Sequence, residues 1–215
     1  MEEKNEYGFS ARPNSGEGTG ILVLHAWWGL NNFFKDFCSR LADEGFVVFA
    51  PDLYHGKVAT TIDEAKRLRS KLSSKQTDYE ILSGLDHLRS TPGISNKPLG
   101  AIGFSLGARW ACWLSLEKPD EIGAVTIFYG SKITDYSKSH AAYLGHFAEN
   151  DEWQSNSGVR KLEKSLNAAN RPATFFVYKG TGHWFFEKDR LDAFNLDAAD
   201  LAWKRTVEFL KTQLE

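Results

Sequence analysis

Short apolar runs recur along the chain and alternate with segments whose apolar residues have helical spacing. The runs are rich in β-branched and aromatic residues, the pattern of strands that are buried on both faces of a parallel sheet. The strands predicted in this way cover residues 20–25, 46–50, 99–104, 124–129, 141–148 and 173–178.

Helices are predicted over residues 33–44, from residue 77 to about residue 91, and from about residue 198 onward. The first stops at Gly45, and the second opens at Thr77, where Glu80 has the spacing of a capping box. No element is assigned to residues 54–74. The alternation of predicted strands and helices along the chain predicts an α/β fold with a mostly parallel sheet and helices on both of its faces. Residues 1–215 are expected to form this fold as a single domain.

The run Gly103-Phe104-Ser105-Leu106-Gly107 lies where a predicted strand turns into a helix. A serine at such a turn, with glycines two residues before and after it, is the pattern of a nucleophile elbow. A glycine-rich turn could instead cradle a phosphate, but the spacing is neither that of a dinucleotide fingerprint nor that of a P-loop. Ser105 is therefore the candidate nucleophile.

A serine nucleophile needs a base and a carboxylate that orients the base, in the chain order serine, acid, histidine. Asp151 follows the strand predicted at 141–148, and His183 follows the strand predicted at 173–178. Both positions are at carboxyl ends of strands, where open α/β sheets hold their ligands. Glu149, Glu152 and Asp135 are alternative acids, and Asp151 is favoured over them.

The other histidines do not show the paired spacing of a metal site, so no metal is expected. His25 and His146 fall at predicted strand ends and could line the pocket, although a structural role through hydrogen bonds is favoured. Cys38 and Cys112 lie in apolar, helix-like stretches and are predicted to be small core residues.

The composition of the chain limits the classes of molecule that it is expected to bind. The 215 residues include 26 Lys and Arg and 28 Asp and Glu, a net charge of -2, which gives no electrostatic footprint for nucleic acid or an anionic membrane. A small molecule is the expected partner. The charged first residues are not followed by the apolar segment of a signal peptide, and no stretch is long enough to span a bilayer. With only two cysteines, a cytoplasmic location is expected.

Several blocks of the chain together resemble the dienelactone hydrolases of the α/β-hydrolase superfamily. Asp151 lies 46 residues after Ser105, and His183 lies 32 residues after Asp151, separations similar to those of that family. The other blocks are residues 9–13, 23–31, 50–54, 128–130 and 182–183. The resemblance covers nearly the whole chain.

This resemblance implies an esterase or lactonase with a Ser105-His183-Asp151 triad and no cofactor. It also implies an oxyanion hole formed by the backbone N–H groups of Leu106 and Trp27. Independently, Leu106 follows the nucleophile and begins a helix whose amino end favours negative charge.

Three departures from the family's namesake bear on the substrate. The namesake has a cysteine where this chain has Ser105, a glutamate where it has Ala26, and a substrate-binding arginine where it has Glu187. A negative charge at Glu187 would repel an anionic dienelactone, so that compound is not the expected substrate.

Aromatic residues follow the strands that carry the proposed site. Trp28 lies in the first of these loops, Trp153 follows the acid, and Trp184 and Phe185 follow the base. They are predicted to contact substrate in a narrow pocket for a small, neutral or hydrophobic ester or lactone. Packing beneath the loops is the alternative role for each of them.

The expected activity is therefore carboxylic ester hydrolysis through an acyl-enzyme intermediate. Other functions could use the same groups: a ligand-binding protein that keeps a hydrolase pocket with little turnover, a thioesterase, a peptidase or an acyltransferase. The sequence does not predict the physiological substrate or the oligomeric state.

Overall fold

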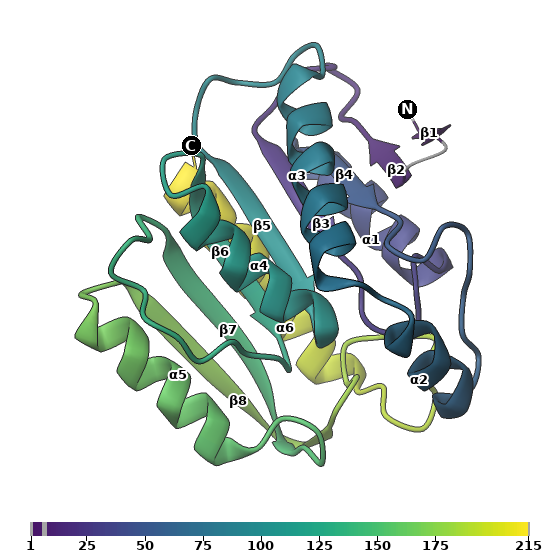
Figure 1. Ribbon diagram of the computed structural model, residues 1–215, viewed down its shortest axis with the longest axis vertical. Coiled ribbons are helices and arrows are strands. Elements are labelled where there is room, and N and C mark those ends of the chain that lie inside the picture. Colours follow the sequence, from purple (N-terminus) through teal and green to yellow (C-terminus); the bar gives the residue numbers. More distant parts are fainter. Residues whose placement is uncertain (1, 6–7, 215) are drawn as a thin grey trace.

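The computed structural model describes residues 2–5 and 8–214 and contains one eight-stranded sheet flanked by helices (Figure 1). The strands are β1 (Glu2–Asn5), β2 (Gly8–Ala11), β3 (Gly20–Leu24), β4 (Val47–Pro51), β5 (Leu99–Phe104), β6 (Ile122–Phe128), β7 (Ala142–Asn150) and β8 (Ala173–Gly182). The helices are α1 (Asn32–Asp43), α2 (Ile62–Ser70), α3 (Ser74–Ser90), α4 (Leu106–Glu117), α5 (Asn156–Ala168) and α6 (Leu196–Leu214).

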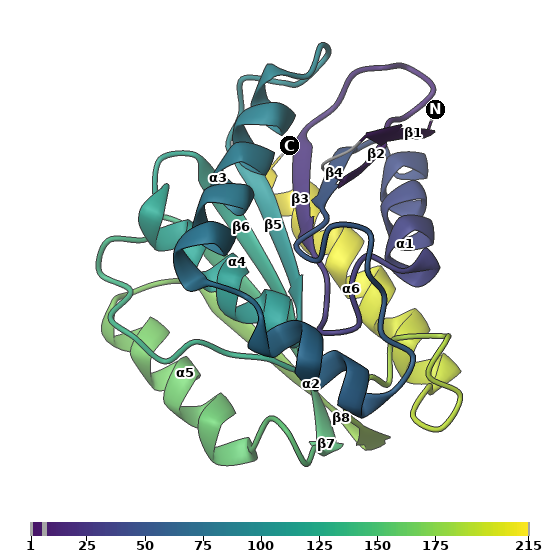
Figure 2. The ribbon, with the colours of Figure 1, turned by 45° about the vertical axis from the view of Figure 1, so that its right-hand side comes forward.

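The strand order is β1-β2-β4-β3-β5-β6-β7-β8, and every pairing from β4 to β8 is parallel. Helices α1 and α6 cover one face of the sheet, and α3, α4 and α5 cover the other (Figures 1 and 2). The predicted α/β fold with a mostly parallel sheet and helices on both faces is confirmed.

The sheet divides the apolar core into two layers because side chains alternate between the faces of a strand. In β3, Ile21 and Val23 pack with residues of α1 and α6, whereas Leu22 and Leu24 pack with residues of α3, α4 and α5. All five residues of β3 are buried, which explains why the central strands have continuous apolar sequences.

Strand ends differ from their predictions by a few residues, as in β8, which continues to Gly182, and the starts of two helices differ from the expected capping pattern. Helix α3 begins at Ser74, so the predicted start at Thr77 is wrong, and the Thr77 hydroxyl donates a hydrogen bond of 3.0 Å to the carbonyl of Ser73. A complete capping box occurs instead at Thr61 and Glu64, where it opens α2 within a segment to which no element was assigned.

Strands β1 and β2 and helix α5 were not predicted. The two strands are four residues long and form an antiparallel pair at the edge of the sheet. Such short edge strands carry little periodicity. Helix α5 did have a readable signal, because Val159, Leu162 and Leu166 form a buried stripe at helical spacing.

The turn between β5 and α4 requires backbone contacts that leave no room for a side chain. A Cβ atom on Gly107 would lie 2.1 Å from the carbonyl oxygen of Leu24, and one on Gly103 would lie 2.3 Å from the carbonyl oxygen of Gly107. Helix α4 can therefore start directly against the end of β3.

We expect Gly107→Ala to destabilise the fold by about 1–3 kcal/mol in urea unfolding, because the added methyl group overpacks against the backbone. Helix propensity alone has the opposite sign and would stabilise an α-helix interior by about 1 kcal/mol. Gly182→Ala is the control, since its Cβ atom would have only ordinary contact, 3.7 Å from the carbonyl oxygen of Asn150. Equal or greater stability of Gly107→Ala would contradict the tight-contact interpretation.

Candidate functional site

Ser105 occupies the turn between β5 and α4 in a conformation that L-residues rarely adopt. Its φ is 50° and its ψ is -106°. Its N–H donates to the carbonyl of Phe128, 2.9 Å away, which ties the turn to the end of β6. Strain of this kind persists only where the surroundings enforce it, and it is common at functional sites. The expected elbow geometry is present.

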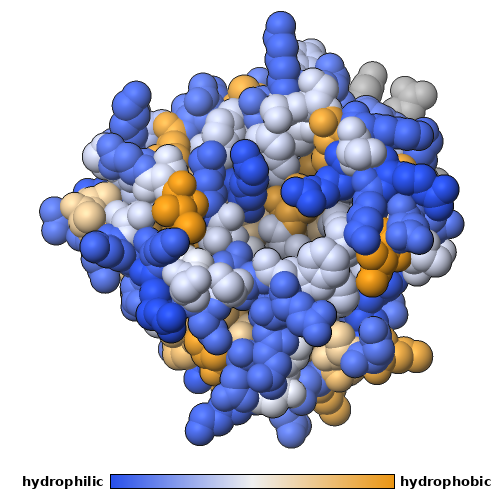
Figure 3. Space-filling view, turned by 60° about the horizontal axis from the view of Figure 1, so that its bottom comes forward, coloured by the Kyte–Doolittle hydropathy of each residue, from blue (hydrophilic) through white to orange (hydrophobic). Residues whose placement is uncertain are grey.

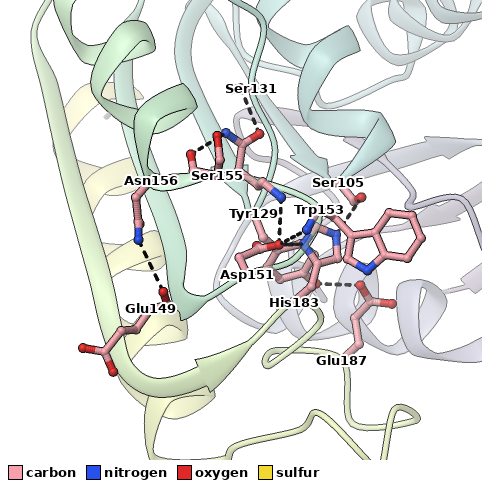
Figure 4. A network of polar contacts seen from close by, with 11 residues as sticks. Ser105, Tyr129, Ser131, Glu149, Asp151, Trp153, Ser155, Asn156, His183 and Glu187 are labelled. Atoms are coloured by element: carbon pink, nitrogen blue, oxygen red, sulfur yellow. Dashed lines mark hydrogen bonds and ion pairs between the residues drawn. The ribbon is translucent and has the colours of Figure 1, made fainter.

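The structure brings Ser105, His183 and Asp151 into one hydrogen-bonded chain (Figure 4). Ser105 Oγ lies 2.9 Å from His183 Nε2, and His183 Nδ1 lies 2.9 and 2.8 Å from the two carboxylate oxygens of Asp151. A carboxylate only accepts, so Nδ1 carries the proton and Nε2 is the acceptor for the serine hydroxyl. This is the tautomer that a general base for Ser105 requires.

Backbone donors hold the Asp151 carboxylate in place. Its Oδ1 atom accepts hydrogen bonds of 2.8 Å from the N–H groups of Trp153 and Gln154. The side chain is only 2% exposed, so these bonds and the histidine replace the water that it loses on burial.

Two of the alternative acids have other partners. Glu149 accepts a hydrogen bond of 2.9 Å from the N–H of Gly180, and Asp135 accepts from the N–H and hydroxyl of Ser137. Glu152 is exposed. Among these acids, Asp151 is the one bonded to His183.

A cavity of about 250 Å³ opens beside Ser105 at the carboxyl end of the sheet. Figure 3 looks onto this end of the molecule and shows a hollow near the middle of the face, bordered by hydrophilic side chains. The lining residues are Trp27, Arg69, Ser105, Leu106, Arg109, Tyr129, Gly130, Ser131, Trp153, Gln154, His183 and Trp184. Leu106 and Trp27, whose N–H groups are the expected oxyanion donors, both line it.

Of the four aromatic residues expected to contact substrate, Trp153 and Trp184 line the cavity. Trp153 is 48% exposed, whereas only 8% of Trp184 is exposed. Their ring centroids are 5.9 Å apart, and Trp27 contacts both, so the three indoles form one aromatic wall.

Trp28 and Phe185 are not among the residues that line the cavity, so the contact with substrate predicted for them stays a prediction. The guanidinium of Arg190 lies 3.9 Å from the ring centroid of Trp28, whose edge packs on Trp184. Phe185 is fully buried between Tyr129 and Tyr178. Both side chains pack beneath the loops, which is the alternative role considered for such aromatics in the sequence analysis.

Sequence reasoning missed two arginines that line the cavity. Arg109 lies one helical turn after Ser105 on α4, a spacing that could have identified it. Arg69 lies on α2, in the segment to which no element was assigned, so no signal placed it near the serine. Within the described chain, neither guanidinium forms an ion pair, and both are exposed at the cavity.

Glu187 does not lie where the sequence analysis expected its charge to act. The side chain is fully buried and is absent from the cavity lining. Burial raises the pKa of Glu187 to about 8, the hydrogen bond from Tyr129 opposes this rise, and nearby Asp189 adds to it. Because the side chain is buried and does not line the cavity, the structure gives no support to the argument that its charge would repel an anionic substrate.

His25 and His146 have the structural roles that were favoured for them. His25 Nδ1 lies 2.7 Å from the carbonyl of Ala26, and Nε2 accepts from the N–H of Leu53. His146 is bonded to the hydroxyls of Tyr178 and Thr206. Burial lowers the pKa of both imidazoles. Neither ring lines the cavity.

Cys38 and Cys112 are free and buried in the core. Burial raises the pKa of Cys112 to about 11 and raises that of Cys38 further. Thiols of this kind are unreactive, in keeping with the predicted role as small core residues.

A second, larger cavity of about 600 Å³ lies against β4 and α3 and shares no lining residue with the first. Its lining holds a contact of 3.2 Å between His55 Nε2 and Glu80 Oε1, and among the described residues no serine of this lining is hydrogen-bonded to a histidine as Ser105 is. Size alone does not identify an active site, so the smaller cavity is the candidate on chemical grounds.

Residues 8–214 contain no cluster of three or more His, Cys, Asp or Glu side chains placed to hold a metal ion. Within the described part of the chain, none of the helices combines the length and apolar character needed to cross a bilayer.

Comparison with known proteins places the chain in a family. The family model described as "Dienelactone hydrolase family" matches residues 7–214. "Protein usf" of Aquifex pyrophilus is 33% identical over 216 residues, covering 96% of this chain and 93% of that protein. A "Putative carboxymethylenebutenolidase" of Aquifex aeolicus is 30% identical, covering 97% and 94%.

A solved structure gives the same result. The crystal structure of a "Putative Dienelactone Hydrolase" from Klebsiella pneumoniae is 25% identical, covers 95% of this chain and 92% of its own, and superposes with a TM-score of 0.82. The chain therefore belongs to the dienelactone hydrolase family of the α/β-hydrolase superfamily, and it is a hydrolase that acts on esters or lactones.

Proposed function

We propose that the protein is a serine hydrolase that cleaves a small carboxylic ester or lactone through an acyl-enzyme intermediate. The observation that carries this proposal is the hydrogen-bonded chain from Ser105 through His183 to Asp151. A free serine hydroxyl is almost never ionised near neutral pH, so a base within hydrogen-bonding distance is what makes it a nucleophile. His183 Nε2 meets that requirement at 2.9 Å.

The proposed reaction has two steps. Ser105 Oγ attacks the carbonyl carbon as His183 Nε2 takes the hydroxyl proton, and the N–H groups of Leu106 and Trp27 bind the oxyanion. The protonated imidazole then gives its proton to the leaving alcohol, which leaves an acyl group on Ser105. Water, activated by the same imidazole, attacks this ester and releases the acid. Asp151 stabilises the imidazolium and remains ionised.

The cavity lining suggests two features of the substrate. Trp27, Trp153 and Trp184 offer a wall for an apolar acyl or alcohol group. Arg69 and Arg109 add two positive charges at the same cavity, which contains no acidic lining residue. We therefore extend the expected class from neutral, hydrophobic esters to esters or lactones that also carry an anionic group.

Ser105→Ala should lower kcat for a chromogenic ester by at least about 10⁴-fold, because the other groups cannot form the acyl-enzyme. The change removes one hydroxyl group, so the unfolding midpoint should stay close to that of the wild type. Ser157→Ala, on the exposed side of α5, is the matched control and should retain the wild-type rate. Comparable turnover by the Ser105 variant would exclude it as the nucleophile.

Asp151→Asn should lower kcat by about 10⁴-fold, because an amide favours the wrong histidine tautomer. Asp135→Asn is the control, since Asp135 is an exposed acid bonded within its own turn. Steady-state kinetics of both variants would test the role of Asp151. Similar small losses in the two variants would refute it.

Charge reversal at Arg69 or Arg109 should change the choice between matched substrates. For a 4-nitrophenyl monoester of succinate compared with the neutral butanoate ester, the ratio of kcat/KM values should fall at least about tenfold in Arg69→Glu and Arg109→Glu. High salt should reduce the effect, because exposed charges are screened. Arg160→Glu, at an exposed position of α5 that does not line the cavity, should leave the ratio unchanged. An unaltered ratio in both cavity variants would contradict anion recognition.

A further inference from the structure

Glu187 and Tyr129 form a buried unit directly behind the proposed base. The Tyr129 hydroxyl donates a hydrogen bond of 2.6 Å to Glu187 Oε1, and both residues are fully buried. Figure 4 shows this pair beside His183. Neither residue takes part in the proposed proton transfer, yet burying a carboxyl group here has a large desolvation cost.

The surroundings of Glu187 favour its uncharged form. No ion pair to Glu187 occurs among the described residues, and its second oxygen, Oε2, is buried without a hydrogen-bond partner. The two charged groups that act on its pKa, Asp189 and Arg190, belong to its own loop and act in opposite directions, since Asp189 raises this pKa and Arg190 lowers it. The guanidinium of Arg190 is placed over the ring of Trp28 and 3.8 Å from Asp189, whose negative charge disfavours ionisation of Glu187.

Tyr129 links this carboxyl group to the histidine. Its ring centroid lies 4.8 Å from that of His183, and Trp184 packs edge-on against the same imidazole at 4.9 Å. The backbone of Tyr129 has a φ of 37°, a strained value for a residue with a side chain, and its N–H donates to the carbonyl of His146. The ring is thus held by its backbone at one end and by Glu187 at the other.

We propose that Glu187 is a positioning residue for the reaction: its uncharged carboxyl group anchors the Tyr129 hydroxyl, and the anchored ring holds the His183 imidazole in line with Ser105. This inference rests on the proposed function. It also gives a role to a buried acid that the proposed proton transfer does not use.

Ionisation of Glu187 would disturb this arrangement. A negative charge there would be buried without a direct ion pair among the described residues, and the repulsion from Asp189 on its own loop would oppose the attraction of Arg190, with Asp151 beyond Tyr129. The loop that carries His183 would have to rearrange to hydrate this charge. Activity should therefore decline as the pH rises through about 8, the pKa to which burial raises the carboxyl group.

Three variants test the proposal. In Glu187→Gln the amide oxygen still accepts from Tyr129 and nothing titrates, in Glu187→Leu the acceptor is lost, and in Tyr129→Phe the donor is lost but the ring remains. Each would be assayed for kcat and KM from about pH 5 to pH 10 and for the rate at which a fluorophosphonate labels Ser105.

Glu187→Gln should keep kcat near pH 7 within about threefold of the wild type and should lose the decline centred near pH 8. Glu187→Leu should lower kcat at least about tenfold with little change in KM, because the imidazole is misplaced but the cavity wall is intact. Tyr129→Phe should show a similar loss, and combining it with Glu187→Leu should add little.

The pH dependence of folding stability tests the protonation of Glu187 independently of activity. The pKa of Glu187 lies above its ordinary value of 4.5, so the folded state binds this proton more tightly than the unfolded state does. The resulting stability is fully present below about pH 4.5 and is lost as the pH rises toward 8. The melting temperature of Glu187→Gln relative to the wild type should therefore increase across this interval.

Two results would overturn the inference: a wild-type kcat in Glu187→Leu, or equal losses at all pH values in Glu187→Gln and Glu187→Leu. If Glu187→Leu does not fold, Glu187→Gln and Tyr129→Phe still decide the question through their pH profiles. Failure of the proposed function gives a different result, because the folded wild-type protein would then not be labelled at Ser105 at any pH.

Discussion

The close approach of helix α4 to the end of strand β3 is the constraint on which the rest of the site depends. Because Gly107 has no side chain, the first turn of α4 can lie against the carbonyl oxygen of Leu24, and Ser105 must then take a positive φ. A Cβ atom on Gly130 would lie 2.4 Å from the carbonyl oxygen of Ser105, so the loop after β6 meets the same turn. The elbow thus brings the ends of β3, β5 and β6 together, with Trp27 and Tyr129 beside the serine.

Two buried acids of the site differ in the hydrogen-bond donors that surround them: Asp151 is bonded directly to His183, and Glu187 is bonded to Tyr129, whose ring packs on His183. Asp151 accepts two backbone N–H bonds and the His183 N–H, which compensate for its lost hydration. Among the described residues, the side chain of Glu187 has one hydrogen-bond donor, the Tyr129 hydroxyl. Burial disfavours the charged form of a carboxyl group, and hydrogen bonds donated to that form oppose the effect, so the number of donors distinguishes the two acids.

The elements and the proposed catalytic residues were largely predictable because they depend on local signals. Strand β5 matches its predicted range, and the glycine spacing around Ser105 located the elbow. The charge of the cavity was predictable only in part: the spacing of Arg109 from Ser105 could have placed it there, whereas Arg69 lies on α2, a helix in a segment to which no element was assigned. The placement of Glu187 also depends on tertiary packing: an acid in a loop is ordinarily solvated, and only the contact with Tyr129 reveals that this one is buried.

The central claim is that Ser105 is an activated nucleophile, and covalent labelling tests it most directly. The intact mass of the folded protein would be measured after exposure to a fluorophosphonate, with Ser105→Ala treated in parallel. The hydrogen-bonded chain to His183 and Asp151 predicts a single adduct on the wild type and none on the variant. A folded wild type without an adduct, or an adduct that persists in Ser105→Ala, would contradict the claim.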